Sequence, residues 1–201
     1  MVIAIVLITV LIVLAACAVG YMFERRRRER QLKDQFGSEY DRTVGEAGDR
    51  RSGERELLDR QKRHEQLDIR PLEPSRAADY RNEWQTIQTR FVDDPEGAIH
   101  DADALIEALM SERGYPIGDF DTKLADLSVQ HADVLQHYRA AHQIATAADA
   151  GEADTEGLRR AMVHYRALFA SLLDDSDRET ADSSATDRNA GTQATASRRT
   201  K

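Results

Sequence analysis

The side chains best suited to metal or acid–base chemistry in this 201-residue chain are its six histidines. None of them forms an i, i+4 pair, and none belongs to an HExxH motif. His137 and His142 are five residues apart, which would point them about 140° apart around one helix. Only histidines from different helices could meet at a metal, so the sequence predicts no metal ligand and no cofactor. The six are His64, His100, His131, His137, His142 and His164.

Paired carboxylates are the second group of residues that could do acid–base work. Asp94 precedes Pro95, however, and an Asp before a Pro is typical of the start of a helix. Asp101 and Asp103 are expected on a solvated face. Because the chain also lacks a Gly-rich phosphate loop and a nucleophile elbow, we predict no catalytic residue.

The first stretch of the chain is its clearest signal. From Val2 to Phe23 there is no charged residue. A helix of this length spans about 33 Å, and the hydrocarbon core of a bilayer is about 30 Å thick. We therefore predict that residues 1–23 are a transmembrane anchor that contacts the lipid bilayer through residues 2–23.

Two other interpretations fit this stretch less well. A cleaved secretory signal would begin with basic residues and have a shorter apolar core. A lipoprotein signal fits better, because Leu14-Ala15-Ala16-Cys17 resembles the bacterial lipobox, in which the cysteine is acylated. The apolar run continues past Cys17, which favours an uncleaved helix and leaves the exported lipoprotein as an alternative.

Five arginines follow the apolar stretch and none precedes it. Lys and Arg near a membrane helix are retained on the cytoplasmic side. The expected location is therefore the plasma membrane, with the N-terminus outside and the bulk of the chain in the cytoplasm. At the membrane interface, the same side chains would reach anionic headgroups. They are Arg25, Arg26, Arg27, Arg28 and Arg30.

Composition excludes several classes of function. The formal net charge is -8 and the pI is about 5.3. Nucleic-acid binding requires a basic face, so no nucleic-acid partner is expected. Cys17 is the only cysteine, which excludes an intramolecular disulfide and a cysteine-based metal site.

The residues after the anchor divide into three parts. We expect residues 24–74 to be a basic juxtamembrane segment and a solvated, charged helical stalk that ends at Pro71 and Pro74. Residues 75–173 carry helical apolar stripes and no strand pattern, which predicts an all-α, small antiparallel helical bundle. Residues 174–201 contain no large apolar side chain and are predicted to be a disordered tail.

Within the bundle, Ser75 is expected to cap the first helix. Its apolar face would carry Tyr80, Trp84, Ile87 and Phe91. Later helices are expected to start at Pro95, to end near Gly114, and to span Phe120–Leu127.

One loop mixes aromatic, apolar and turn residues between two predicted helices. Binding residues are often found on such loops, so it is a candidate interaction loop. The alternative is a tight connector whose two aromatic side chains pack into the core. The candidate residues are Tyr115, Pro116, Ile117, Asp119 and Phe120.

Several motifs give the chain a likeness to a known group. It resembles an uncharacterised family of bacterial membrane-anchored helical-domain proteins that has no established activity. That resemblance implies an apolar N-terminal segment, a basic cluster and a helical domain, and it supplies no site residues. The motifs include Phe36-Gly37-Ser38-Glu39-Tyr40-Asp41-Arg42-Thr43, Leu67-Asp68-Ile69-Arg70-Pro71-Leu72, Arg90-Phe91-Val92-Asp93-Asp94-Pro95, Arg113-Gly114-Tyr115-Pro116 and Met162-Val163-His164-Tyr165-Arg166.

The sequence thus favours a single-pass membrane protein that presents a small helical domain to the cytoplasm and binds an unidentified protein partner. The alternatives are a helical bundle that binds a small ligand or acts as an enzyme, and a lipoprotein acylated at Cys17.

Overall fold

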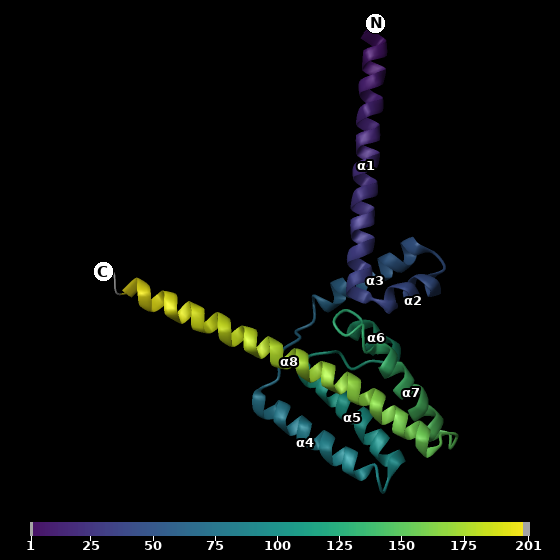
Figure 1. Ribbon diagram of the computed structural model, residues 1–201, viewed down its shortest axis with the longest axis vertical. Coiled ribbons are helices and arrows are strands. Elements are labelled where there is room, and N and C mark those ends of the chain that lie inside the picture. The colour runs from purple at the N-terminus through teal and green to yellow at the C-terminus, as the bar shows by residue number, and fades with distance from the viewer. Residues whose placement is uncertain (1, 199–201) are drawn as a thin grey trace. The chain divides into compact units, whose positions relative to one another are not determined.

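A computed structural model describes the backbone of residues 2–198 and the side chains of residue 11 and residues 15–181 (Figure 1). Over this described range the chain forms eight helices and no strand. The predicted all-α fold is therefore confirmed.

The chain divides into two compact units, residues 1–61 and 62–201. The first unit contains α1 (Val2–Phe36), α2 (Ser38–Ala47) and most of α3 (Arg50–His64). The boundary lies inside α3, earlier in the chain than the predicted boundary at residue 75.

Helix α1 includes residues 2–23 of the predicted anchor, and residue 1 lies outside the described residues. Most side chains of residues 2–23 lie outside the described residues. Among the described residues, no helix combines the length and the apolar character that crossing a bilayer requires. The anchor stays a prediction.

The first unit differs from the solvated stalk that the sequence predicts. Leu32, Phe36, Tyr40 and Leu57 are all buried. Leu32 and Phe36 are four residues apart and share one face of α1. Tyr40 follows after the break at Gly37, near the start of α2. The sequence interpretation was wrong here because these apolar residues are sparse along the chain, and α1, α2 and α3 are separated by tight glycine-containing turns.

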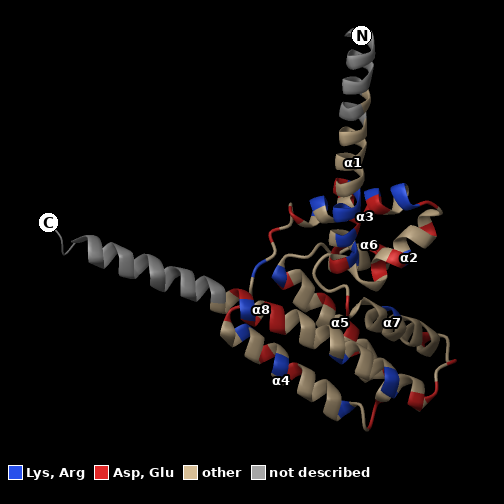
Figure 2. Cartoon of the chain, turned by 45° about the horizontal axis from the view of Figure 1, so that its top comes forward, with Lys and Arg blue, Asp and Glu red and all other residues tan. Residues whose placement is uncertain are grey.

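The second unit is a bundle of two helical hairpins and one short helix. Helix α5 contacts α4, α7 and α8, and α7 packs along α8. Charged residues of both signs are interspersed along the helices of the bundle (Figure 2). Its helices are α4 (Pro74–Arg90), α5 (Pro95–Arg113), α6 (Phe120–Leu127), α7 (Leu135–Asp149) and α8 (Thr155–Arg198).

Local signals fix several helix ends. The Asp94 carboxylate accepts a hydrogen bond from the Gly97 N–H at 3.0 Å, as predicted for a cap. Gly114 ends α5 with φ 96°, and a Cβ there would lie 2.1 Å from the Asp68 carbonyl oxygen. The prediction that Ser75 caps α4 is wrong, since Pro74 already occupies the first turn.

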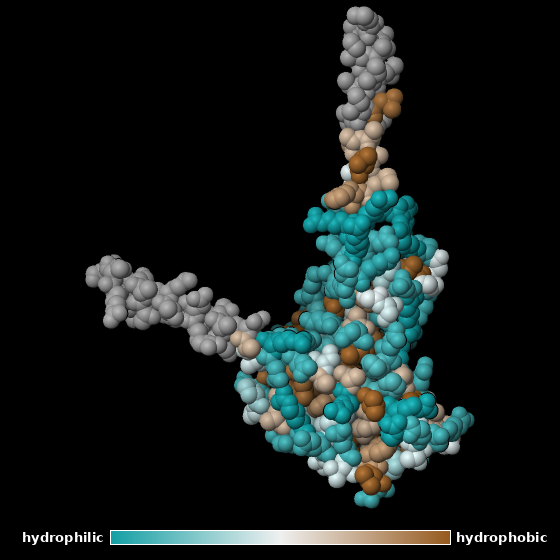
Figure 3. Space-filling model, viewed as in Figure 1, coloured by the Kyte–Doolittle hydropathy of each residue, from teal (hydrophilic) through white to brown (hydrophobic). Residues whose placement is uncertain are grey.

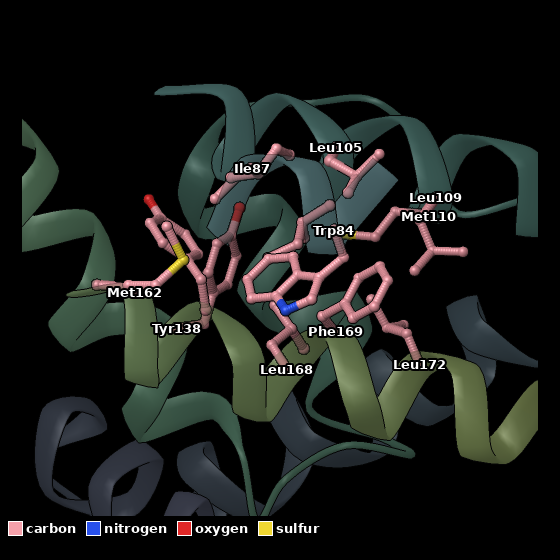
Figure 4. Close-up of a cluster of buried hydrophobic side chains, with 14 of the residues drawn as sticks. Trp84, Ile87, Leu105, Leu109, Met110, Tyr138, Met162, Leu168, Phe169 and Leu172 are labelled. Carbon is pink, nitrogen blue, oxygen red and sulfur yellow. The ribbon is translucent and has the colours of Figure 1, made fainter. Parts of the chain in front are cut away.

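The core of the second unit lies between the two hairpins (Figure 4). Trp84 is 5% exposed, and its ring stacks on Phe169 with centroids 4.7 Å apart. Such aromatic pairs contribute about 0.5–1.5 kcal/mol beyond the area that they bury. This contact joins α4 to α8 and confirms the expected core position of Trp84.

Helix α8 does not leave the fold at the predicted domain end, Leu173. Ser176 is buried, and its hydroxyl accepts a hydrogen bond from the Leu72 N–H at 2.6 Å. Arg113 is buried and donates to the Glu179 carboxylate at 2.8 Å. The start of the predicted tail is therefore part of the folded unit. Composition does not reveal this, because the residues that hold the segment, Ser176 and Glu179, are polar and pair with buried groups elsewhere in the chain. The side chains of the rest of the predicted tail, residues 182–201, lie outside the described residues. Its disorder stays a prediction.

Candidate functional site

The candidate site is a groove between α4 and α5, with a volume of about 470 Å³. Its floor is formed by Tyr80, Ile87 and Leu105, which are buried members of the core. Ala104 and Ala108 form the exposed side on α5. Because these two side chains are small, the groove is open along the α5 surface. We call this feature the α4–α5 groove.

The spacing of the lining residues explains how the sequence builds the groove. Ala104 and Ala108 are four residues apart on α5, and Arg76, Tyr80 and Ile87 follow one stripe of α4. From Arg76 to Ile87 the stripe is roughly 16 Å long, at about 1.5 Å per residue. This length accommodates about three turns of another helix.

A fixed ion pair holds one end of the groove. The Arg76 guanidinium donates two hydrogen bonds to the Glu112 carboxylate, at 2.8 and 2.7 Å. The Tyr80 hydroxyl donates to the same carboxylate at 2.8 Å. The Arg76 contact lowers the pKa of Glu112, and burial together with Glu112 raises the pKa of Tyr80 to about 12. All three groups therefore keep their charge state at neutral pH.

The other end of the groove carries a second set of paired charges. Arg90 donates to Asp94 at 2.6 Å and also forms an ion pair with Asp101, which lines the groove. Hydrogen bonding from Arg90 lowers the pKa of Asp94. The groove thus combines an apolar floor with charged ends, an arrangement suited to an amphipathic helix.

Asp103 was expected on a solvated face, and that expectation is wrong. Burial raises the pKa of its carboxyl group, and Tyr165 lies beside it. Burial and Asp103 in turn raise the pKa of the Tyr165 phenol. The helical position alone does not show this, because Tyr165 comes from a distant part of the sequence.

The candidate interaction loop is divided between core and surface. Tyr115 is 3% exposed, whereas Ile117 is 74% exposed. Pro116 is exposed, and the exposed Asp119 caps α6 by accepting a hydrogen bond from the Thr122 N–H at 2.8 Å. Phe120 is half-buried and stacks on His142, with ring centroids 3.8 Å apart. The two aromatic residues follow the connector interpretation, and Ile117 is the apolar residue that the loop presents to solvent.

His131 lies at the centre of a buried polar cluster. Its Nε2 is 3.1 Å from the Tyr115 hydroxyl, and its Nδ1 is 2.9 Å from the Ser171 hydroxyl. The Asp175 carboxylate lies 3.4 Å from the same Nδ1. Burial lowers the pKa of His131 to about 4, although Asp175 opposes this shift. Both ring nitrogens have protein partners, so the cluster ties α8 to the segment between α5 and α7 and does not resemble a substrate site.

The remaining histidines are spread over the bundle. His100 lies 3.1 Å from Asp149, and His64 is a buried neighbour of Tyr115. His137 and His164, from different helices, meet with their Nδ1 atoms 2.9 Å apart. Within the described residues, no group of three or more His, Cys, Asp or Glu side chains could hold a metal ion.

The predicted membrane-interface arginines lie along α1 in the first unit. Arg25 is half-buried, and Arg26, Arg27, Arg28 and Arg30 are exposed. Figure 3 shows the described surface of α1 changing from apolar residues to a hydrophilic band. Exposure of these side chains leaves them free to contact a charged surface.

No family profile, no curated protein and no solved structure matches this chain.

Proposed function

We propose that this chain is a single-pass membrane protein whose helical domain binds a helix of another protein in the cytoplasm. The observation that carries the membrane part is in the sequence: an uncharged stretch from Val2 to Phe23 is followed directly by five arginines. Positive residues beside a membrane helix are retained in the cytoplasm. The resemblance to membrane-anchored helical proteins points the same way.

The α4–α5 groove supports the second part of the proposal. A partner helix would place apolar side chains on Tyr80, Ile87 and Leu105, and the small Ala104 and Ala108 would allow its backbone to approach. The charges at both ends of the groove are already paired, which removes one cost of association. The exposed Glu83 is the charged lining residue between the two ends. An apolar stripe over about three turns is the usual footprint of helix-in-groove recognition.

In-cell photocrosslinking on the full chain tests the binding part. A photoreactive residue at Ala104 should give one discrete adduct, whereas the same residue at Gln143, exposed on α7, should not. Ala108→Arg fills the groove and should abolish the Ala104 adduct without changing protein level. Equal adducts at both positions, or an adduct that survives Ala108→Arg, would refute groove binding.

Reporter fusions test the membrane part independently. A fluorescent protein placed after Lys201 should be bright, and alkaline phosphatase at the same position should be inactive. An active phosphatase would instead indicate export and favour acylation at Cys17.

A further inference from the structure

The closest contact between two histidines lies on the surface of the α7–α8 hairpin. His137 is in the first turn of α7 and is exposed, and His164 is half-buried in α8. Their Nδ1 atoms are 2.9 Å apart, and their ring centroids are 5.1 Å apart. One ring must therefore donate an N–H to the lone pair of the other.

This separation matches a particular coordination geometry. Imidazole nitrogens bind metals of this series at about 2.0–2.1 Å, so two nitrogens 2.9 Å apart subtend about 90° at a shared ion. An angle of about 90° is that of adjacent ligands in a square-planar or tetragonal site, which Cu²⁺ and Ni²⁺ prefer. Tetrahedral Zn²⁺ would require the nitrogens to separate to roughly 3.3 Å.

We propose that His137 and His164 form a two-histidine site for one divalent cation of the Cu²⁺ or Ni²⁺ type, with water in the remaining positions. On binding, the donating ring moves its proton from Nδ1 to its own Nε2 by exchange with water, so that both Nδ1 atoms present a lone pair and the ion takes the place of the shared proton. Each ring then turns about its Cβ–Cγ bond to aim that lone pair at the ion. This torsion is broad for histidine. Binding joins α7 to α8 and stabilises the hairpin.

The protonation state of His164 is compatible with the metal geometry of the pair. Burial, His137 and Arg160 lower the pKa of His164, so its imidazole is neutral at neutral pH. Neutral imidazole is the form that binds metals. The positive charge of Arg160, near His164, opposes the binding of a cation.

Acidic residues line a neighbouring hollow on the same hairpin. A hollow of about 370 Å³ is lined by Asp133, Asp174 and Asp175, with Arg178 as its only described cation. Ala167, three residues after His164 on α8, also lines it. The hollow therefore begins within one turn of the histidine pair, and its charge attracts cations.

The test uses the full chain in detergent with Cys17→Ser, so that the thiol cannot bind the probe. Cu²⁺ and Ni²⁺ are titrated against the parent, His137→Gln, His164→Gln and the double variant. The parent should bind one equivalent, and its Cu²⁺ electron paramagnetic resonance spectrum should show coupling to two nitrogens. Either single variant should weaken binding at least tenfold, and the double variant should lose no more than either alone. Ni²⁺ should raise the melting temperature of the parent and of none of these three variants.

His100→Gln is the matched control, because His100 is an exposed histidine of the same unit that pairs with Asp149. It should bind like the parent. The proposal is overturned if His137→Gln retains parental affinity, or if the parent binds less than one equivalent at 1 mM metal. It is also overturned if the parent Cu²⁺ spectrum shows no coupling to nitrogen, a result that does not depend on any variant folding.

Discussion

At the scale of single residues, His131 links the buried polar cluster to acid stability. Its pKa is lowered to about 4 in the folded chain, whereas an unfolded histidine has a pKa of about 6.5. The unfolded state therefore binds more protons between these values. Stability should be full above about pH 6.5 and fall as the pH decreases toward 4, by on the order of 2–3 kcal/mol from this residue.

His131→Gln removes this titration and retains a polar side chain that can bond to Tyr115 and Ser171. We expect it to be less stable than the parent at pH 7 and to lose less stability between pH 6.5 and pH 4. Urea unfolding of the full chain at several pH values measures both. His100→Gln, an exposed site, should follow the parent curve. If His131→Gln has the same pH dependence as the parent, His131 is not the source of the acid sensitivity.

The same cluster shows why sites are harder to read from sequence than helices. Tyr115 belongs to the candidate loop, but its partner His131 is 16 residues away along the chain, and the Ser171 hydroxyl that contacts His131 is a further 40 residues away. The His137–His164 pair is separated by 27 residues. Periodicity reports contacts within one helix and contains nothing about which faces of two helices meet.

At the scale of secondary-structure elements, the turn between α2 and α3 depends on one close approach. A Cβ on Gly53 would lie 2.7 Å from the Val44 Cα, so backbone would have to move. Gly53 is in α3, whereas Gly45 is in α2 and has no atom within 4 Å of its ideal Cβ. By helix propensity both glycines would weaken a helix, but only Gly53 is required by packing.

These two glycines form a matched pair for a test. Gly45→Ala should be neutral or should stabilise α2 by up to about 1 kcal/mol, because Ala is the better helix former. Gly53→Ala should separate α2 from α3 and weaken the bond from the Tyr40 hydroxyl to Glu54, which is 2.9 Å long. Hydrogen–deuterium exchange of the full chain should be faster in α2 and α3 for Gly53→Ala alone. Unchanged exchange in that variant would show that the α2–α3 contact is not close.

Helix bounds were the most predictable feature of these elements. Asp94 and Pro95 start α5, and the predicted helix Phe120–Leu127 coincides with α6. These features depend on neighbours in the sequence. The α4–α5 groove was missed because Tyr80 and Ile87 satisfy the pattern of a core stripe, and the pattern does not show that Ala104 and Ala108 leave its edge uncovered.

At the scale of the whole molecule, the extent of the folding unit decides which fragment is stable. Sequence patterns place the domain at residues 75–173, since all the broad apolar stripes lie there. The structure adds a segment on each side. The Arg70 N–H donates a hydrogen bond to the Arg113 carbonyl oxygen at 2.9 Å, and the Leu72 N–H donates to the Ser176 hydroxyl.

Residues 62–181 should therefore melt cooperatively by far-UV circular dichroism, at a higher temperature than residues 75–173. The shorter fragment loses Glu179, the carboxylate that pairs with the buried Arg113, and leaving a buried charge without its partner costs about 3–5 kcal/mol. Arg113→Met should destabilise residues 62–181. It should also narrow the difference in melting temperature between the two fragments, because it removes the charge that the truncation leaves unpaired. If both fragments of the unsubstituted chain melt at the same temperature, the flanking segments do not belong to the folding unit, and the boundaries expected from sequence are correct.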